Sequence, residues 1–362
     1  MNGGVLRAAE PTIVPTATPT TAPPTATDPM PLAFPRDEGP HHRLTEWWYY
    51  TGHLAFQGTH PGVEPGGVGF EYVIFRAERG DFPVGWASHF AITYPGGRTF
   101  RYSQRTEFGP QVDRSPAAGG FDLSILGAQG ATTPATAGPW TMGGAAGRDH
   151  LHASAEPGTI ELDLTTSRPP VLHDGDGWVD LGLAGGTYYY SRTRMDVTGK
   201  LAFPGSSGSS VFGSAWFDHQ WGDFIAVGAG GWDWFSVQLS DGRDLTLSLV
   251  HGPNGEHVLD YGTLVDADGT AHHLDASAFR VTILDHWKSP HSGADYPAEW
   301  RVDLPAANLS LHLKPTLADQ ELDARASSGN FYWEGEVNVE VAGPPGSTLN
   351  GLGYVELTGY AE

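Results

Sequence analysis

The sequence predicts an all-β protein that contains two closed or nearly closed antiparallel β-barrels or sandwiches. With 362 residues, the chain exceeds the usual size of a single hydrophobic core, which favours two domains. Its 49 Gly and 11% aromatic residues favour many short strands and tight turns, because Gly interrupts helices and aromatic side chains suit a pleated surface. Segments in which apolar and polar residues alternate recur in both halves of the chain. Barrel closure removes exposed sheet edges and can enclose a ligand.

Residues 1–33 are expected to form a disordered tether, because Pro11 to Pro31 is a Thr/Ala/Pro tract with little apolar surface to bury. Such stalks often separate an export signal or a lipid anchor from a folded domain. We therefore expect an exported protein, periplasmic or extracellular, whose native signal or lipid anchor has been removed. The alternative is an ordinary frayed terminus. No apolar run reaches the roughly 18 residues that span a bilayer, so the chain as given is expected to be soluble.

A first domain is expected over residues 34–204. The aromatic run Glu46–Leu54 predicts a strand that is buried on both faces. Further strands are bounded by Gly or Pro turn signals or show clear alternation. These are Gly69–Arg76, Trp86–Thr93, Gly120–Ile125, Ile160–Thr165 and Thr187–Val197. Apart from one strand, the Gly/Ala/Pro-rich stretch 108–148 is expected to form loops.

A second domain is expected over residues 205–362, because Lys200–Ser210 is rich in Gly and Ser and is the best boundary or hairpin loop in the chain. Alternation predicts strands over 245–250, 309–314 and 337–341. One short helix is expected around Asp275 to Phe279.

Composition excludes several function classes. The 42 acidic and 20 basic residues give a formal net charge of -22, which disfavours nucleic acid as a partner. The absence of Cys excludes disulfides, thiol nucleophiles and Cys-ligated metals. The motifs of serine hydrolases, P-loop proteins, dinucleotide-binding proteins and zinc proteases are also missing. The pairs His150-x-His152 and His272-His273 lack a third ligand at a recognisable spacing, so we expect solvated strands there and no metal or other cofactor.

The chemistry of the chain is concentrated in Trp216-Phe217-Asp218-His219-Gln220-Trp221, followed by Trp232 and Trp234. Indoles beside ionisable groups are typical of a pocket for a lipophilic ligand. A carboxyl group in such a wall loses its water shell, so Asp218 could give up a proton near neutral pH. The alternative is that the indoles fill a barrel, with Asp218 and His219 bonded to backbone groups.

Other polar or aromatic residues are weaker candidates for substrate binding: Trp48, Glu46, Glu71, His89, Trp333, Glu334 and Tyr354. Glu46, Glu71 and His89 interrupt apolar strands, and buried polar groups need partners, so these three could bond to one another across a sheet. The alternative is a structural role for each, or an outward orientation.

Seven motifs, in order from Glu46 to Tyr360, together resemble the lipocalin-like AttH and carotenoid 1,2-hydratase (CrtC) superfamily. They include EWWY-x-TGHL at 46–54, WFDHQWG at 216–222, W-x-WF at 232–235, YP-x-x-W at 296–300, DQEL at 319–322, YWEG at 332–335 and GYVELTGY at 353–360. The resemblance implies two tandem lipocalin-like barrels with an apolar cavity, and in hydratase members the addition of water to a terminal alkene. The role of the acid would fall on Asp218. The chain looks closest to a poorly characterised branch of secreted, predicted hydrolases.

We therefore expect acid-catalysed hydration or cyclisation of an isoprenoid or polyene C=C bond. Asp218 would protonate the alkene, indole faces would attract the resulting cation, and water held by His219 or Gln220 would capture it. Trp216, Trp221, Trp232 and Trp234 are the candidate wall. Two alternatives stay open: a carrier for a hydrophobic small molecule, and a catalyst that acts only through the shape of its cavity. A removed N-terminal anchor could tether the protein to a membrane surface, and the sequence leaves the oligomeric state open.

Overall fold

The computed structural model describes residues 28–57, 67–127, 138–182, 185–224, 230–342 and 349–361. Within these ranges every regular element is a β-strand or a 3-10 turn, so the predicted all-β class is confirmed. Most of the expected tether, residues 1–27, lies outside the described residues, and residues 31–362 form one compact unit. None of the described helical turns is long and apolar enough to cross a membrane. The turns are η1 (Arg36–Glu38), η2 (Pro95–Gly97), η3 (Pro110–Val112), η5 (His173–Gly175) and η8 (Pro305–Ala307).

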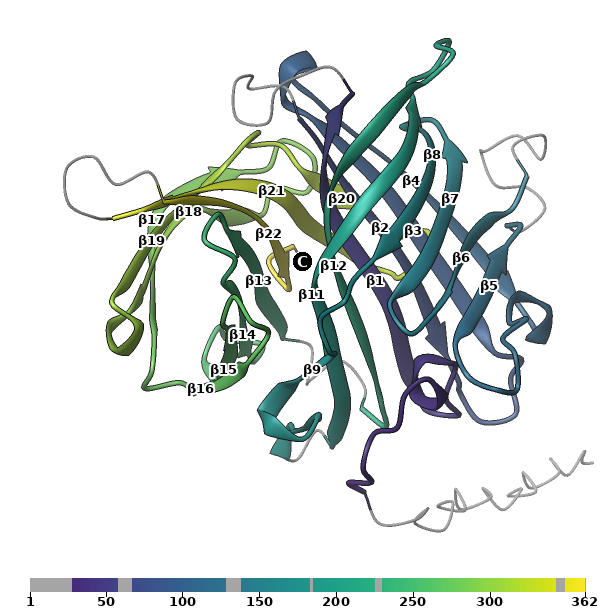
Figure 1. Cartoon of the computed structure of the whole chain (residues 1–362), viewed down its shortest axis with the longest axis horizontal. Helices are drawn as coiled ribbons and strands as arrows, with labels where there is room; N and C mark the ends of the chain where they lie inside the picture. Colours follow the sequence, from purple (N-terminus) through teal and green to yellow (C-terminus); the bar gives the residue numbers. More distant parts are fainter. Residues whose placement is uncertain are drawn as a thin grey trace, which may run out of the picture. The chain divides into compact units, whose positions relative to one another are not determined.

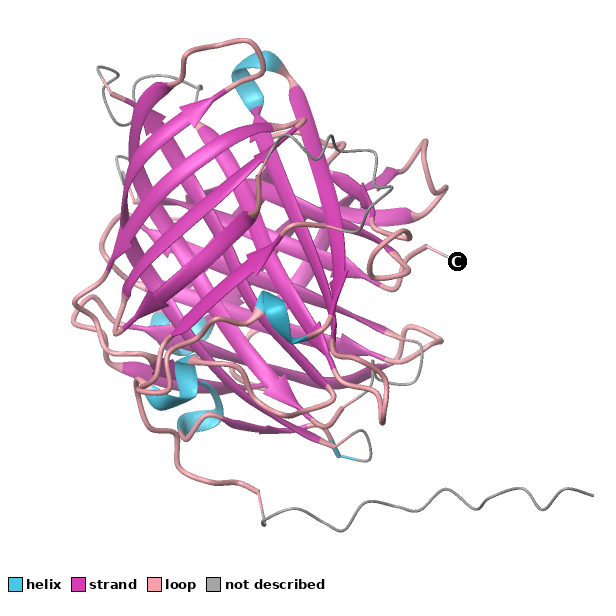
Figure 2. Cartoon of the chain, turned by 90° about the vertical axis from the view of Figure 1, so that its right-hand side faces the viewer, coloured by secondary structure: helices cyan, strands magenta, loops and turns pink. Residues whose placement is uncertain are grey.

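The strands form two curled antiparallel sheets (Figures 1 and 2). The first sheet has the strand order β4-β3-β2-β1-β12-β11-β8-β7-β6-β5, with β9 and β10 paired to β11. Its strands are β1 (Thr45–Phe56), β2 (Val68–Ala77), β3 (Gly85–Tyr94), β4 (Thr99–Phe108), β5 (Phe121–Ile125), β6 (Trp140–Ala145), β7 (Arg148–Ala155), β8 (Gly158–Thr165), β9 (Val171–Leu172), β10 (Trp178–Asp180), β11 (Gly186–Ala202) and β12 (Ser209–Gly222).

Side chains connect the two outer strands of the first sheet and complete a barrel. Arg105 of β4 donates from Nη1 to the backbone oxygen of Ile125 on β5 at 3.1 Å, and Glu107 Oε2 accepts from the backbone N–H of Leu126 at 2.7 Å. The barrel interior holds a large apolar core that includes Trp48, Phe70 and other fully buried side chains. β4 and β5 stand at the two ends of the described strand order, so side-chain contacts rather than a shared backbone ladder close the barrel.

The second sheet is a half-barrel with the order β16-β15-β14-β13-β22-β21-β19-β18-β17, and β20 pairs with β21. Its own core includes Trp300, Trp333 and a set of Leu and Val side chains. Its strands are β13 (Gly231–Leu239), β14 (Asp244–His251), β15 (His257–Val265), β16 (Ala271–Asp275), β17 (Arg280–Lys288), β18 (Asp295–Leu304), β19 (Leu309–Pro315), β20 (Glu321–Asp323), β21 (Phe331–Val341) and β22 (Asn350–Thr358).

Local chemistry explains where the structure differs from the sequence-based expectations. The expected helix at Asp275 to Phe279 is a turn after β16, because Asp275 Oδ1 accepts hydrogen bonds from the N–H and the hydroxyl of Ser277. The stretch expected to hold one strand also contains β6. The expected boundary at 204/205 lies in the hairpin between β11 and β12. Because β12 pairs with both β1 and β11, the chain changes sheets later, between Gly222 and Gly231.

The outer face of the barrel packs directly against the second sheet. An aromatic cluster joins them, with Tyr49 and Trp216 from the first sheet and Trp234 and Tyr354 from the second. The sheets lie close together at Gly69, where an added Cβ would lie 2.3 Å from the Tyr354 hydroxyl. The sheets are therefore close-packed around Gly69, and the pocket described below shares Tyr49 and Trp234 with the aromatic cluster.

Candidate functional site

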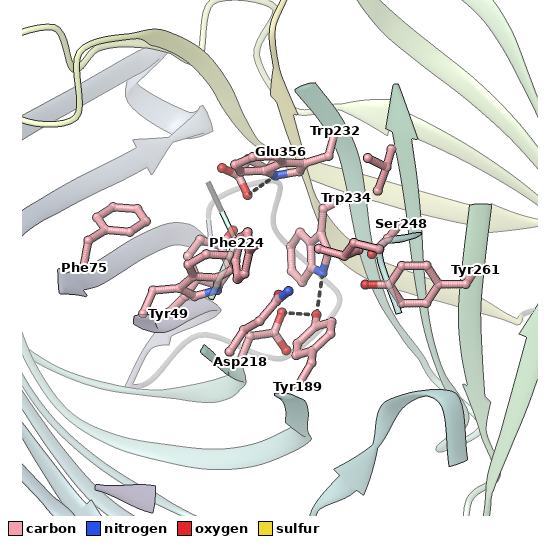
Figure 3. Close-up of a pocket in the computed structure, with 14 residues that line it drawn as sticks. Tyr49, Phe75, Tyr189, Asp218, Phe224, Trp232, Trp234, Ser248, Tyr261 and Glu356 are labelled. Atoms are coloured by element: carbon pink, nitrogen blue, oxygen red, sulfur yellow. Dashed lines mark hydrogen bonds between the residues drawn. The ribbon is translucent and has the colours of Figure 1, made fainter. Parts of the chain in front are cut away.

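A pocket lies between the two sheets and is lined by residues from both (Figure 3). The space open to the centre of a water-sized sphere is about 90 Å³. At about 10–15 Å³ for each water by this measure, the pocket has room for several water molecules. Its wall is mostly aromatic and carries two carboxyl groups. The lining residues are Trp47, Tyr49, Phe75, Leu181, Tyr189, Asp218, Gln220, Phe224, Trp232, Trp234, Ser248, Val250, Tyr261 and Glu356.

Strand register explains which residues of the first sheet face the pocket. Asp218 of β12 lies opposite Tyr49 of β1 and Ser191 of β11, so these three side chains form one row across the outer face of the barrel. Two residues further along β12, Gln220 lies opposite Trp47 of β1 and Tyr189 of β11. Because side chains alternate along a strand, this row emerges on the same face.

A corresponding row on the second sheet forms the opposite wall. Trp234 of β13 lies opposite Glu356 of β22 on one side and Ser248 of β14 on the other, and Ser248 lies opposite Tyr261 of β15. All four residues line the pocket. Figure 3 shows Glu356 and Asp218 entering the pocket from opposite sides.

Asp218 is almost completely buried, with a relative exposure of 3%. Its Oδ1 accepts hydrogen bonds from Trp216 Nε1 at 2.7 Å and from the Ser191 hydroxyl, and its Oδ2 accepts one from the Tyr189 hydroxyl at 2.7 Å. Burial raises the pKa of Asp218 to about 7, although these three donors oppose the rise. At neutral pH the carboxyl group is therefore divided between its acid and its base form, which suits proton transfer.

The neighbours of Asp218 extend to the second sheet. The Tyr189 oxygen accepts a hydrogen bond from Trp234 Nε1 at 3.1 Å, which leaves its own proton for Asp218 (Figure 3). Ser191 Oγ lies 2.7 Å from His173 Nε2, and His173 Nδ1 lies 3.0 Å from Thr263 Oγ1 on β15. Burial lowers the pKa of His173 to about 3, so its imidazole is neutral at ordinary pH. These contacts hold the orientation of the acid.

Glu356 is the second carboxyl group of the pocket. Its Oε2 accepts a hydrogen bond from Trp232 Nε1 at 3.1 Å, and its Oε1 has no hydrogen-bond partner among the described residues (Figure 3). Burial raises the pKa of Glu356 to about 7, and the nearby charge of Asp218 adds to the rise, against the Trp232 hydrogen bond. The pocket thus holds two weak acids of similar strength.

His219 and Trp221 do not line the pocket, contrary to the expectation that His219 acts beside Asp218. As odd-numbered neighbours of Asp218 and Gln220 on β12, they point into the barrel. There His219 Nε2 contacts Glu46 Oε1 at 3.0 Å and its ring stacks on Trp48. Burial lowers the pKa of His219 to about 4, although its hydrogen bond to the Glu46 carboxylate opposes the fall. The water-holding role remains a prediction for Gln220 only.

We expected that Glu71 and His89 could bond to each other across the sheet. Instead, the Tyr332 hydroxyl lies between them. It contacts Glu71 Oε1 at 3.1 Å and His89 Nδ1 at 2.6 Å. Burial raises the pKa of Glu71 to about 8 and lowers that of His89 to about 3. Glu46 takes no part in this network.

Three further candidates also lie outside the pocket lining. Glu334 accepts a hydrogen bond from the Tyr49 hydroxyl at 2.7 Å, and Tyr354 belongs to the aromatic cluster between the sheets. Trp333 lies in the core of the second sheet. Their positions indicate packing between and within the sheets.

One group of described residues has metal-ligand spacing: His41, Glu46 and His219, whose candidate ligand atoms lie within 4.8 Å of one another. Both imidazoles contact the same carboxylate oxygen, at 2.7 Å from His41 and 3.0 Å from His219. The ring of His41 also stacks on Trp221 with centroids 3.9 Å apart. These hydrogen bonds account for the cluster, and a metal would have to displace them. The paired histidines at 150/152 and 272/273 contact exposed carboxylates such as Asp163 and Asp266.

Sequence reasoning missed several residues of the site: Tyr189, Glu356 and Tyr261, which line the pocket, and Ser191, which donates a hydrogen bond to Asp218. Alternation along the expected strand Thr187–Val197 could have placed Tyr189 and Ser191 on one face. Glu356 stands in a motif that was recognised, two residues from Tyr354. Tyr261 comes from a strand that the sequence did not predict, and its approach depends on how the sheets pack.

Comparison with known proteins places the chain among β proteins of the same architecture. A family model described as AttH-like matches residues 25–360. The structure is similar to that of a Nitrosomonas europaea protein described as an AttH, with 28% identity and a TM-score of 0.79, over 93% of this chain and 99% of that chain.

Two more distant structures share the fold. Kievitone hydratase from Nectria haematococca has 14% identity and a TM-score of 0.62, and CghA solved with Sch210972 has 14% identity and a TM-score of 0.50. Each similarity covers 86% of this chain and 88% of the other. A comparison with curated protein sequences gives no match.

Proposed function

The chain belongs to the AttH-like family, and we propose that it is an enzyme that adds a proton to a C=C bond of an apolar isoprenoid or polyene molecule. The product is a hydrated or a cyclised carbon skeleton. The observation that carries the proposal is Asp218, a buried carboxyl group with a pKa of about 7 on the wall of an aromatic pocket. Such a group is a neutral acid for part of the protein population at pH 7, and a general acid works best when its pKa lies near the working pH.

The proposed reaction begins with transfer of the Asp218 proton to one alkene carbon, which leaves a cation on the neighbouring, more substituted carbon. The faces of Trp232 and Trp234 attract that positive charge. A water molecule hydrogen-bonded to Gln220 then forms the new C–O bond, and its extra proton returns to the Asp218 carboxylate. If a second double bond of the substrate reaches the cation first, a C–C bond closes a ring and loss of a proton restores the acid.

Two further points support the proposal. The lining contains Trp, Tyr and Phe from both sheets, so the wall suits a hydrocarbon group better than a polar metabolite. The fold is shared with kievitone hydratase, whose name states a hydration. The small volume of the pocket suits the end of a long molecule rather than its whole length.

The test compares the wild-type protein with Asp218→Asn after incubation with a panel of acyclic terpenoids and polyenes. Mass analysis distinguishes the reactions, because hydration adds the mass of water and cyclisation leaves the mass unchanged. We expect product from the wild type, a loss of at least about 100-fold in the variant, and unchanged quenching of Trp fluorescence by the substrate. Equal turnover in both proteins would indicate a catalyst that acts through shape alone, and binding without turnover in the wild type would indicate a carrier.

A further inference from the structure

We propose that the pocket binds a hydrophobic cation, such as an alkylammonium group, with Glu356 as its counter-ion and the faces of Trp47, Trp232 and Trp234 as its cage. The proposal goes beyond alkene chemistry, because binding of a stable cation requires no reaction. It concerns an amine-bearing apolar molecule as ligand.

Indole rings from both sheets line the pocket and stand at different angles. Trp47 of the first sheet and Trp232 of the second stack with ring centroids 6.4 Å apart and planes 13° apart. Trp234 lies at right angles to Tyr49, with centroids 5.3 Å apart and an interplanar angle of 85°. The negative faces of these rings attract a positive charge, and Trp is the strongest of the aromatic side chains in this respect.

The charged groups of the pocket all have the same sign. Among the described lining residues, Asp218 and Glu356 are acidic and none is Lys, Arg or His. The chain as a whole carries a formal net charge of -22, which attracts cations over long distances at low salt. A neutral hydrocarbon would leave an ionised carboxylate of the pocket without a compensating charge, whereas an ammonium group would supply one.

Glu356 is better placed than Asp218 to act as the counter-ion. All the oxygens of Asp218 already accept hydrogen bonds, from Trp216, Ser191 and Tyr189. Glu356 has one such bond, from Trp232 to Oε2, and its Oε1 has none from the described residues. An ammonium group can therefore bind to Oε1 of Glu356 without breaking the hydrogen bond from Trp232 to Oε2.

Binding of a permanent cation should strengthen as the pH rises through 7, since the ligand needs the ionised form of Glu356. The charge of Asp218 on β12 raises the pKa of Glu356, and the charge of Glu356 in turn raises the pKa values of Glu71 on β2 and Glu334 on β21. Burial raises the pKa of Glu71 to about 8, so this group stays mainly protonated below pH 7.5, and burial also raises the pKa of Glu334 well above its ordinary range. Tyr49, Tyr332 and the donor Trp232 remain neutral throughout.

The experiment measures binding of benzyltrimethylammonium and of its neutral carbon analogue, neopentylbenzene, by Trp fluorescence between pH 6 and 7.5. We expect the cation to bind at least tenfold more tightly than the hydrocarbon at pH 7.5, and its Kd to fall about five- to tenfold over this range. Glu356→Gln should remove both effects. Glu340→Gln, a matched change at a side chain that is 83% exposed, should remove neither. Trp232→Phe keeps an aromatic face but removes the N–H that donates to Glu356. Because this hydrogen bond lowers the pKa of Glu356, the midpoint of the pH dependence of cation binding should rise in the variant.

Equal affinity for the cation and the hydrocarbon at pH 7.5 would overturn the proposal, and so would unchanged cation binding in Glu356→Gln. The outcome is separate from that of the Asp218→Asn turnover assay. Hydration without ammonium binding would leave the proposed reaction standing, and ammonium binding without turnover would leave the cation site standing.

Discussion

Replacement of Asp218 by Asn should make the folded protein more stable at alkaline pH. Burial raises the pKa of Asp218 from 3.8 to about 7. A carboxyl group whose pKa is higher in the folded than in the unfolded state contributes stability that is fully present below pH 3.8 and is lost as the pH rises through 7. The full loss corresponds to about 4 kcal/mol, at about 1.4 kcal/mol for each pH unit between the two pKa values.

Asn has nearly the shape of the protonated acid and cannot ionise, so the variant should escape this loss. Between pH 5 and pH 8 the free energy of unfolding of the wild type should fall by about 2–3 kcal/mol more than that of Asp218→Asn. Comparison at two pH values cancels any effect of the substitution on packing that does not depend on pH. Urea denaturation at both pH values measures the difference, and Glu340→Gln serves as an exposed control.

A difference between the two proteins that stays constant from pH 5 to pH 8 within about 0.5 kcal/mol would refute the reasoning, because it would place the pKa of Asp218 near its ordinary value. The reasoning would also be refuted if the free energy of unfolding fell more in Asp218→Asn than in the wild type between pH 5 and pH 8. Removal of the Asp218 charge also lowers the pKa of Glu356, since that charge contributes to its rise, and this adds to the advantage of the variant.

Two further substitutions test the site and the contact between the sheets. Gln220→Leu should reduce the hydrated product by at least about tenfold while substrate consumption continues, because the pocket keeps its acid and loses the side chain proposed to hold water. Mass analysis measures the ratio of hydrated to other products. An unchanged ratio would contradict that role. Gly69→Ala should destabilise the protein by about 1–3 kcal/mol in thermal denaturation. The new Cβ would lie 2.3 Å from the Tyr354 hydroxyl and 3.0 Å from Glu336 Cδ. An unchanged melting temperature would show that the sheets are not held at this distance.

The sequence predicted much of the fold because its signals are local. The aromatic run at 46–54 and the alternation at 160–165 became β1 and β8 almost as expected. The helix at Asp275 to Phe279 failed because a side chain that bonds to a nearby N–H stabilises a turn. The change of sheet could not be placed from the Gly/Ser-rich loop at 204, since the pairing of β12 with β1 joins residues that are about 170 positions apart.

The site was predicted less completely, for a physical reason. Asp218 and His219 are adjacent in sequence, but consecutive side chains of a strand point to opposite faces of the sheet. The two side chains therefore lie in different environments. One lines the pocket, and the other lies in the barrel beside Glu46. Glu356 joins Asp218 only through the packing of the second sheet on the barrel, which no periodicity in the sequence records.

The most direct test of the central claim is a pH titration of the Asp218 carboxyl carbon by NMR, in protein labelled with ¹³C at the Asp side chains. The Asp218→Asn variant identifies the resonance by its absence. The account predicts that this signal changes with a midpoint near pH 7, well above the midpoints of the exposed aspartates. A midpoint below pH 5 would mean that Asp218 is a permanent carboxylate at neutral pH, and it could not then serve as the acid.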